Sequence, residues 1–232
     1  MEKNPSGKYL AYFQNHTNTY GNLKDLEKKF FEAAECPEIS GIVIATRPDC
    51  MNDDAVSVIE RLSRVTFVMI ELGFQTSCRK TAAYINRCYE NDELDKAIGR
   101  LKEKCPEIHV VCHVIFGLPE ETQEDMLKTV QYAVNAGADG IKIALLHVLQ
   151  GTLLAEDYRN GLFRCMEMGE YFKVLGYVLE RIPENIVIHR LTGDGAKKIL
   201  IAPLWTGNKK IVLNSMMKYF RENGIKQGKS LK

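Results

Sequence analysis

The regular alternation of apolar runs with segments of helical periodicity is the feature that most constrains the fold of this sequence. Five apolar runs precede residue 150 and a sixth follows it; they span residues 8–14, 41–46, 66–73, 108–119, 140–148 and 185–194. Most are continuously apolar, which is typical of parallel strands with helices on one face and core on the other. Strand–helix units joined by short loops imply right-handed crossovers, so the sequence predicts an α/β sheet or barrel.

The segments between these runs repeat their apolar residues at helical spacing. The predicted helices cover residues 23–35, 54–64, 92–105, 122–139, 166–182 and 208–223. Thr122 and Asp125 have the spacing of a capping box with aspartate in place of glutamate, and Gly137 stands where a helix C-terminal cap is expected. These local signals agree with the periodicity and fix the limits of the fourth predicted helix.

Length and composition fit one domain with one large core. The chain has 232 residues, of which 45% are hydrophobic and 26% charged, and it has no internal repeat or obvious linker. Beyond residue 150 the strand–helix rhythm loosens. We therefore predict a single compact domain in which residues 1–150 form a partial barrel and residues 151–232 form a C-terminal extension packed on it.

Charge and cysteine content exclude several classes of protein. The formal net charge is +1, which gives no global attraction to nucleic acid or to an anionic membrane. The first ten residues carry no apolar signal core, and no apolar run approaches the roughly 18–20 residues that a membrane span needs. The seven cysteines form no C-x-x-C, so neither a disulfide framework nor a zinc site is predicted. We expect a cytoplasmic protein with no membrane partner.

Polar residues follow most of the apolar runs, at the ends where ligands bind in parallel α/β folds. The run 41–46 ends in Thr46-Arg47-Pro48-Asp49, and Glu71 directly follows four apolar residues. A carboxylate is costly to bury without a partner, so Glu71 either pairs with Arg47 or accepts hydrogen bonds from a ribose diol. Strand ends also meet solvent, so each polar residue taken singly is equally compatible with a structural role.

Two of the histidines in the later runs, His113 and His147, are candidates for a functional role. His113 fits a hydrogen-bonded core position better than a catalytic one, whereas His147, at a predicted strand end, fits either role. The sequence contains no P-loop, no G-x-G-x-x-G, no H-E-x-x-H and no G-x-S-x-G. The residues alone therefore predict a barrel with a polar mouth and name no reaction.

Five short motifs carry a resemblance to a known family. They are IATRPD (44–49), ELGFQT (71–76), HVIFGLPEET (113–122), GIKIALLHVLQGT (140–152) and VIHRLTGD (187–194). Together they resemble the radical S-adenosylmethionine (SAM) superfamily, in particular the bacterial branch similar to the catalytic subunit of elongator. The resemblance implies a partial (β/α)6 TIM-like barrel that holds SAM and a [4Fe-4S] cluster and cleaves SAM to a 5′-deoxyadenosyl radical. It also makes tRNA one candidate substrate.

The resemblance further implies roles for ten residues, although it names no catalytic residue. Gln14 is expected near the methionyl group of SAM, and Thr46, Arg47 and Asp49 near SAM or the substrate. The other expected contacts are Glu71 and Gln75 with ribose or carboxylate, Ile115, Gly117 and Leu118 with adenine, and His147 with the substrate.

The sequence departs from the family where the cluster should bind. The family's three cluster cysteines lie in the loop after its first strand, and no such triplet exists here; the run 8–14 resembles the family's second strand. We therefore expect a barrel that lacks its first strand and has no metal ligands. Such a chain is expected to be inactive alone, and its exposed barrel edge could associate with another chain.

Two other functions remain open from the sequence. One is a cluster-free binding module for RNA or a small ligand at the barrel mouth, for which Trp205, Lys209 and Lys210 could stack on bases and contact phosphate. A solvated helix start explains that patch more simply. The other is an ordinary barrel enzyme that uses Glu71, His113 and His147 in acid–base catalysis.

Overall fold

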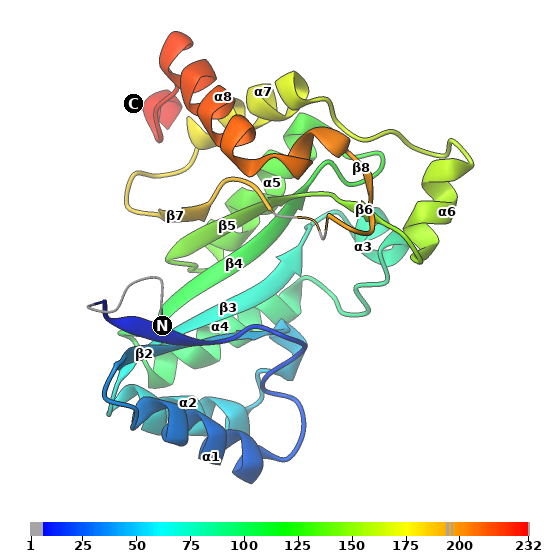
Figure 1. Ribbon diagram of the computed structural model, residues 1–232. Coiled ribbons are helices and arrows are strands. Elements are labelled where there is room, and N and C mark those ends of the chain that lie inside the picture. The colour runs from blue at the N-terminus through cyan, green and yellow to red at the C-terminus, as the bar shows by residue number, and fades with distance from the viewer. Residues whose placement is uncertain (1–6, 194, 196, 232) are drawn as a thin grey trace. The chain divides into compact units, whose positions relative to one another are not determined.

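The computed structural model describes residues 7–193, 195 and 197–231 (Figure 1). The chain separates into two compact units that interleave along the sequence. The first comprises Met1–Phe74, Tyr89–His113 and Ala133–Gly140; the second comprises Gln75–Cys88, Val114–Tyr132 and Ile141–Lys232. We describe each unit by itself. The predicted boundary at residue 150 stays a prediction.

All six predicted strands are present. They are β1 (Tyr9–Phe13), β2 (Ile39–Thr46), β3 (Phe67–Gln75), β4 (His109–Phe116), β5 (Gly140–Leu145) and β7 (Val187–Arg190). They form one sheet whose order, β1-β2-β3-β4-β5-β7, follows the chain, and β2 pairs in parallel with both β1 and β3. Sequential order with helical crossovers is the arrangement that the apolar runs predicted.

In the first unit, helices cover one face of the strands. The helices are α1 (Leu23–Ala34), α2 (Asp53–Ser63) and α4 (Asp92–Lys104); α2 packs against α1 and α4. Ile44 of β2 and Ile70 of β3 are register partners, and both are fully buried. Because side chains alternate along a strand, Glu71, the partner of Ala45, lies on the opposite face.

The second unit contains α3 (Arg79–Tyr84), most of α5 (Gln123–Asn135), α6 (Leu153–Arg159), α7 (Met168–Leu179) and α8 (Lys209–Glu222). It also holds a two-stranded antiparallel sheet of β6 (Val148–Leu149) and β8 (Leu200–Ala202). The six predicted helices are all present. The helix α3 and the strands β6 and β8 were not predicted, because elements this short show no clear periodicity.

The local signals at the ends of α5 are confirmed. The backbone N–H of Thr122 donates to Oδ2 of Asp125 at 2.9 Å, and the N–H of Asp125 donates to Oγ1 of Thr122 at 3.2 Å. Gly137 has φ +101°, a conformation that glycine adopts without strain, and it ends the helical segment. Within the part of the chain that the structure describes, no helix is both long enough and apolar enough to cross a membrane.

Candidate functional site

The ten residues assigned by resemblance divide equally between the two units. Gln14, Thr46, Arg47, Asp49 and Glu71 belong to the first unit, and Gln75, Ile115, Gly117, Leu118 and His147 to the second. Nearly all lie at or just after the carboxyl end of a strand, as expected for this fold class. Their contacts are described unit by unit.

Glu71 is the best-supported polar residue of the first unit. It is only 5% exposed, yet its Oε2 accepts a hydrogen bond from the Tyr12 hydroxyl and lies 2.8 Å from Nε2 of His113. Two polar partners offset the cost of taking a carboxylate out of water. The structure therefore holds Glu71 in one position on the face opposite the helices, with His113 as a hydrogen-bonded residue at its side.

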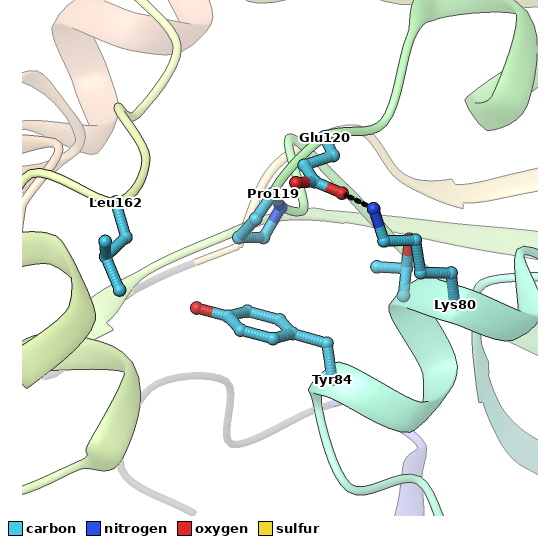
Figure 2. Close-up of a pocket in the computed structure, with 6 residues that line it drawn as sticks. Lys80, Tyr84, Pro119, Glu120 and Leu162 are labelled. Carbon is cyan, nitrogen blue, oxygen red and sulfur yellow. Dashed lines mark hydrogen bonds and ion pairs between the residues drawn. The ribbon is translucent and has the colours of Figure 1, made fainter.

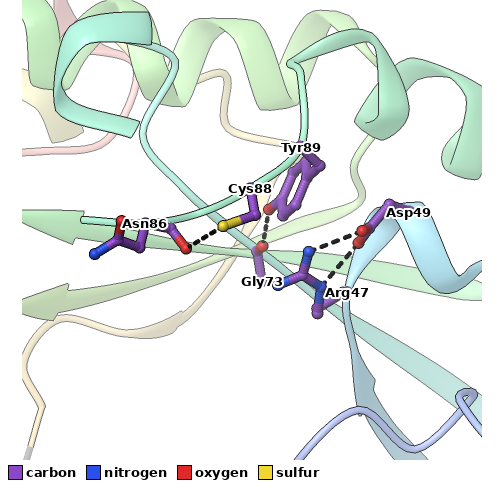
Figure 3. Close-up of polar contacts among 6 residues, drawn as sticks. All are labelled: Arg47, Asp49, Gly73, Asn86, Cys88 and Tyr89. Atoms are coloured by element: carbon purple, nitrogen blue, oxygen red, sulfur yellow. Dashed lines mark hydrogen bonds and ion pairs between the residues drawn. The ribbon is translucent and has the colours of Figure 1, made fainter. Parts of the chain in front are cut away.

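Arg47 makes its ion pair with Asp49, two residues away, and the pairing with Glu71 that the sequence left open is not formed. Its Nε donates to Oδ1 of Asp49 at 2.9 Å and its Nη2 donates to Oδ2 at 2.8 Å (Figure 3). The guanidinium also lies 5.1 Å from the centre of the Tyr89 ring, whose hydroxyl donates to the Gly73 carbonyl. The hydrogen bond to Asp49 raises the pKa of Arg47, so this guanidinium is charged and fixed in direction.

Thr46 has a supporting role in the structure. It is buried, and its Oγ1 lies 2.6 Å from Oγ1 of Thr19, which also donates to the Cys50 carbonyl at 2.9 Å. Asn18 adds two bonds, since its Nδ2 donates to the carbonyls of Phe13 and Ala45. These contacts tie the segment after β1 to the end of β2. Gln14, at the start of that segment, is exposed.

In the second unit, a polar network fixes the turn that follows β3. Gln75 has φ +65°, which is unusual for a residue with a side chain. The next residue, Thr76, is completely buried; its hydroxyl donates to Oε1 of Glu121 at 2.5 Å, and its carbonyl accepts from Nη1 of Arg87 at 2.6 Å. Thr129 of α5 accepts from the Ser77 N–H at 3.0 Å. The conformation of Gln75 is thus held by its neighbours.

Glu121 is a polar residue after the fourth predicted strand to which the sequence analysis assigned no role. Burial raises its pKa to about 7, although the Thr76 hydroxyl favours the charged form. Its second oxygen, Oε2, is buried and has no hydrogen-bond partner among the described residues. Only the pair of glutamates after Gly-Leu-Pro signals this site in the sequence, and that pair does not show which of the two is buried.

The segment after β4 turns at Gly117. Its φ of +80° explains the glycine, because a side chain there would be strained. Its N–H donates to Sδ of Met126 at 3.4 Å. Leu118 is buried, and Ile115 is half-buried on β4. These residues supply apolar surface beside a tight backbone turn, and their contact with adenine stays a prediction.

His147 lies between β5 and β6 and packs against two glycines. A Cβ atom added at Gly195 would lie 2.8 Å from Cδ2 of the imidazole, and one added at Gly193 would lie 3.5 Å from Cε1. Glycine at position 195 therefore makes room for the ring. The structure brings His147 together with the segment after β7, and its role toward a substrate stays a prediction.

The patch of Trp205, Lys209 and Lys210 contains a tryptophan already engaged in packing. Nε1 of Trp205 donates to the Met166 carbonyl at 2.9 Å, and its ring lies 5.9 Å from that of the buried Tyr171. Lys209 and Lys210 are exposed at the start of α8. These contacts support the simpler reading, in which the patch is a solvated helix start.

The donor sets fit SAM better than they fit an iron–sulfur cluster. In the first unit, Glu71 within β3 offers a carboxylate and Arg47 after β2 offers a guanidinium, which suit the hydroxyl or amino groups and the carboxylate group of SAM. Over residues 7–193, 195 and 197–231, no three His, Cys, Asp or Glu side chains gather in a way that could hold a metal ion. The described residues thus do not fit a [4Fe-4S] cluster, and no chemical step is derived through one.

Comparisons with known proteins cover almost the whole chain. Residues 3–133 match the Radical SAM superfamily and residues 138–222 match the Radical_SAM C-terminal domain. Among curated proteins, YtqA of Bacillus subtilis is 37% identical over 228 residues, which cover 98% of this chain and 70% of YtqA. YhcC of Escherichia coli is 32% identical over 235 residues, which cover 98% of this chain and 73% of YhcC.

A solved structure supports the fold independently of sequence. The chain superposes on the archaeal Methanocaldococcus infernus Elp3 with a deleted N-terminus at a TM-score of 0.79 and 18% identity; the match covers 96% of this chain and 56% of Elp3. This confirms the predicted fold class, an α/β partial barrel of the radical SAM type. Two family matches that together span most of the sequence, and relatives more than 30% identical over nearly all of it, lead to one conclusion: the chain belongs to the radical SAM superfamily.

Proposed function

We propose that this chain forms the part of a radical SAM enzyme that binds SAM and the substrate. Its membership of the superfamily supports this proposal. In such enzymes SAM supplies, on reductive cleavage, a 5′-deoxyadenosyl radical that abstracts hydrogen from a substrate. The residues of this chain contribute binding and orientation.

The buried carboxylate of Glu71 is the observation that carries the proposal. A carboxylate fixed by Tyr12 and His113 can accept hydrogen bonds from a ribose diol or an amino group without first being ordered. A purely structural carboxylate is more often exposed, because burial is costly. We assign Glu71 to the recognition of SAM.

Arg47 is assigned to an anionic group of SAM or of the substrate. Its bidentate pair with Asp49 and its stacking on Tyr89 fix the guanidinium before any ligand binds. A fixed guanidinium loses little entropy when it meets a carboxylate or phosphate. Asp49 then acts by orienting Arg47. Thr46, at the end of β2, is proposed to lie near SAM or the substrate, and Gln14, directly after β1, near the methionyl group of SAM.

The residues of the second unit keep the roles that the resemblance implied. Gln75 is proposed to contact ribose or carboxylate, and His147 the substrate. Ile115, Gly117 and Leu118 are proposed to form an apolar surface for adenine, which suits their half-buried and buried positions. We propose tRNA as one candidate substrate; the alternative function is a cluster-free module that binds RNA or a small ligand at the barrel mouth.

Calorimetric titration of the chain with SAM tests the proposal. We expect binding that weakens about tenfold or more in Glu71→Gln, the loss typical of a buried hydrogen-bonded charge. Glu103→Gln, an exposed substitution on α4, is the matched control and should bind SAM like the wild type. Equal SAM affinity in wild type and Glu71→Gln would refute the assignment, provided that these two proteins show the same circular dichroism spectrum.

A further inference from the structure

The second unit contains a pocket that none of the assigned residues lines. It has a volume of about 310 Å³ and is lined by Lys80, Thr81, Tyr84, Pro119, Glu120 and Leu162 (Figure 2). That volume lies at the lower end of the range for small-molecule sites. The lining combines apolar walls with one oppositely charged pair, so the pocket has a definite chemical character.

The apolar walls are held in place by hydrogen bonds to one residue, Asp157. The Tyr84 hydroxyl donates to Oδ2 of Asp157 at 2.5 Å, and the backbone N–H of Leu162 donates to the Asp157 carbonyl at 3.0 Å. Nevertheless Tyr84 is 41% exposed and Leu162 68% exposed. Apolar side chains that are ordered and still exposed form a surface that a ligand can cover at little entropic cost.

Figure 2 shows the Tyr84 ring facing Pro119 and Leu162 across the pocket. Both opposing side chains are apolar, and the proline ring is rigid. A flat ligand can lie against the Tyr84 ring while its other face contacts Pro119. Stacking of this kind favours an aromatic ligand over a branched aliphatic one.

The polar edge of the pocket is the ion pair between Lys80 and Glu120. Both side chains are mostly exposed, and exposed ion pairs contribute little free energy, so a ligand can separate the two partners and contact both of them at little cost. Lys80 offers only donors and Glu120 only acceptors. Because their charges cancel, the complementary ligand is neutral at this edge and carries an acceptor beside a donor.

We propose that this pocket binds a nucleobase of a ligand other than SAM. The base stacks on Tyr84, and its polar edge lies between Lys80 and Glu120. Adenine, guanine and cytosine each carry an exocyclic amino group or ring N–H beside a ring nitrogen or carbonyl, which matches this pair. The base can come from a free nucleotide or from single-stranded RNA, since both present the same chemistry. The proposal does not depend on SAM binding elsewhere in the chain.

Saturation-transfer NMR and calorimetry with the four nucleoside monophosphates test the proposal. We expect binding of at least one of them, with transfer from the protein to the base protons. Tyr84→Ala should weaken it about tenfold or more, as stacking energies imply. Leu162→Ser, an exposed change that should leave folding intact, should weaken it severalfold. Tyr20→Ala is the matched control, because Tyr20 is 77% exposed and belongs to the first unit.

Further binding experiments distinguish the possible sources of the nucleobase and test other ligands of the pocket. A short single-stranded RNA that binds much more tightly than its monomers points to RNA, and equal affinities point to a free nucleotide; either result supports the proposal. Competition by saturating SAM would overturn it, because the pocket would then be the adenine site of SAM. Binding of N-acetyltyrosinamide without binding of any nucleotide would also overturn it, as would full nucleotide binding in a folded Tyr84→Ala.

Discussion

Oε2 of Glu71 and Nε2 of His113 meet at 2.8 Å across two strands of the sheet, β3 and β4. The contact makes each residue dependent on the other. His113 gains a hydrogen bond in a half-buried position, and Glu71 gains a partner that reduces the cost of its burial. Removal of either side chain leaves the other without this hydrogen bond.

The variant His113→Ala is therefore expected to lower the free energy of unfolding by about 1–3 kcal/mol, the cost of leaving a buried acceptor under-satisfied. Urea unfolding monitored by circular dichroism measures this change. In a double-mutant cycle with Glu71→Gln, the double variant should lose less stability than the two single variants added together. Strict additivity would show that the two groups do not interact.

Glu121 gives the stability of the protein a characteristic pH dependence. Burial raises the pKa of its carboxyl from 4.5 to about 7 in the folded chain. The folded state thus holds its proton more tightly than the unfolded state, so the associated stability is fully present below pH 4.5 and is lost as the pH rises through about 7. The loss amounts to about 3 kcal/mol.

Glu121→Gln should remove this dependence, since glutamine stays neutral and can accept the Thr76 hydrogen bond. The melting temperature of wild type and variant, measured from about pH 5 to pH 8, should diverge as the pH rises, with the variant the more stable at the alkaline end. Histidine titrations affect the melting temperatures of both proteins equally, so they cancel when the curve of the variant is subtracted from that of the wild type. Parallel curves would contradict the raised pKa.

The strands of this fold could be predicted because their signal is local. The run 66–73, for example, lies within or next to the observed strand Phe67–Gln75, since a buried parallel strand must be apolar along its length. The partners of Glu71 could not be predicted in the same way. Tyr12 and His113 lie on other strands, and their approach depends on sheet order and register, which no local pattern specifies.

The contacts of Arg47 show a different limit. The pair with Asp49 is local and could have been predicted from the sequence. Glu71 of the neighbouring strand, however, carries the same charge and was an equally acceptable partner. The structure forms the pair with Asp49, because two residues of separation at the start of a 3₁₀ turn bring two guanidinium nitrogens, Nε and Nη2, onto the Asp49 carboxylate. The pocket beside Tyr84 gave no signal, because its lining comes from one short helix, α3, and two separate loops.

Arg87 should be essential to the turn after β3. It is 5% exposed, and its Nη1 donates to the carbonyl of Thr76, the residue after the left-handed Gln75. Arg87→Ala is expected to cost about 2 kcal/mol and to speed hydrogen exchange of the Ser77 and Cys78 amides, because a buried carbonyl loses its donor. Arg221→Ala, an exposed arginine of the same unit, should change neither quantity. Unchanged exchange rates in Arg87→Ala would show that the turn is held by its other contacts alone.

Gly41 and Gly99 provide a matched pair of glycine-to-alanine substitutions in the first unit. A Cβ at Gly41 of β2 would lie 2.8 Å from the Phe67 carbonyl oxygen and 2.9 Å from Cδ2 of Leu10, so adjacent strands would have to shift. Gly41→Ala is expected to cost about 1–3 kcal/mol, the range for overpacking a core position. At Gly99, within α4, a Cβ meets no atom within 4 Å, and Gly99→Ala should stabilise the protein by about 0.5–1 kcal/mol through helix propensity. Urea unfolding of both variants measures the contrast, and a Gly41→Ala variant as stable as Gly99→Ala would show that β2 and β3 are not packed as closely as the structure has them.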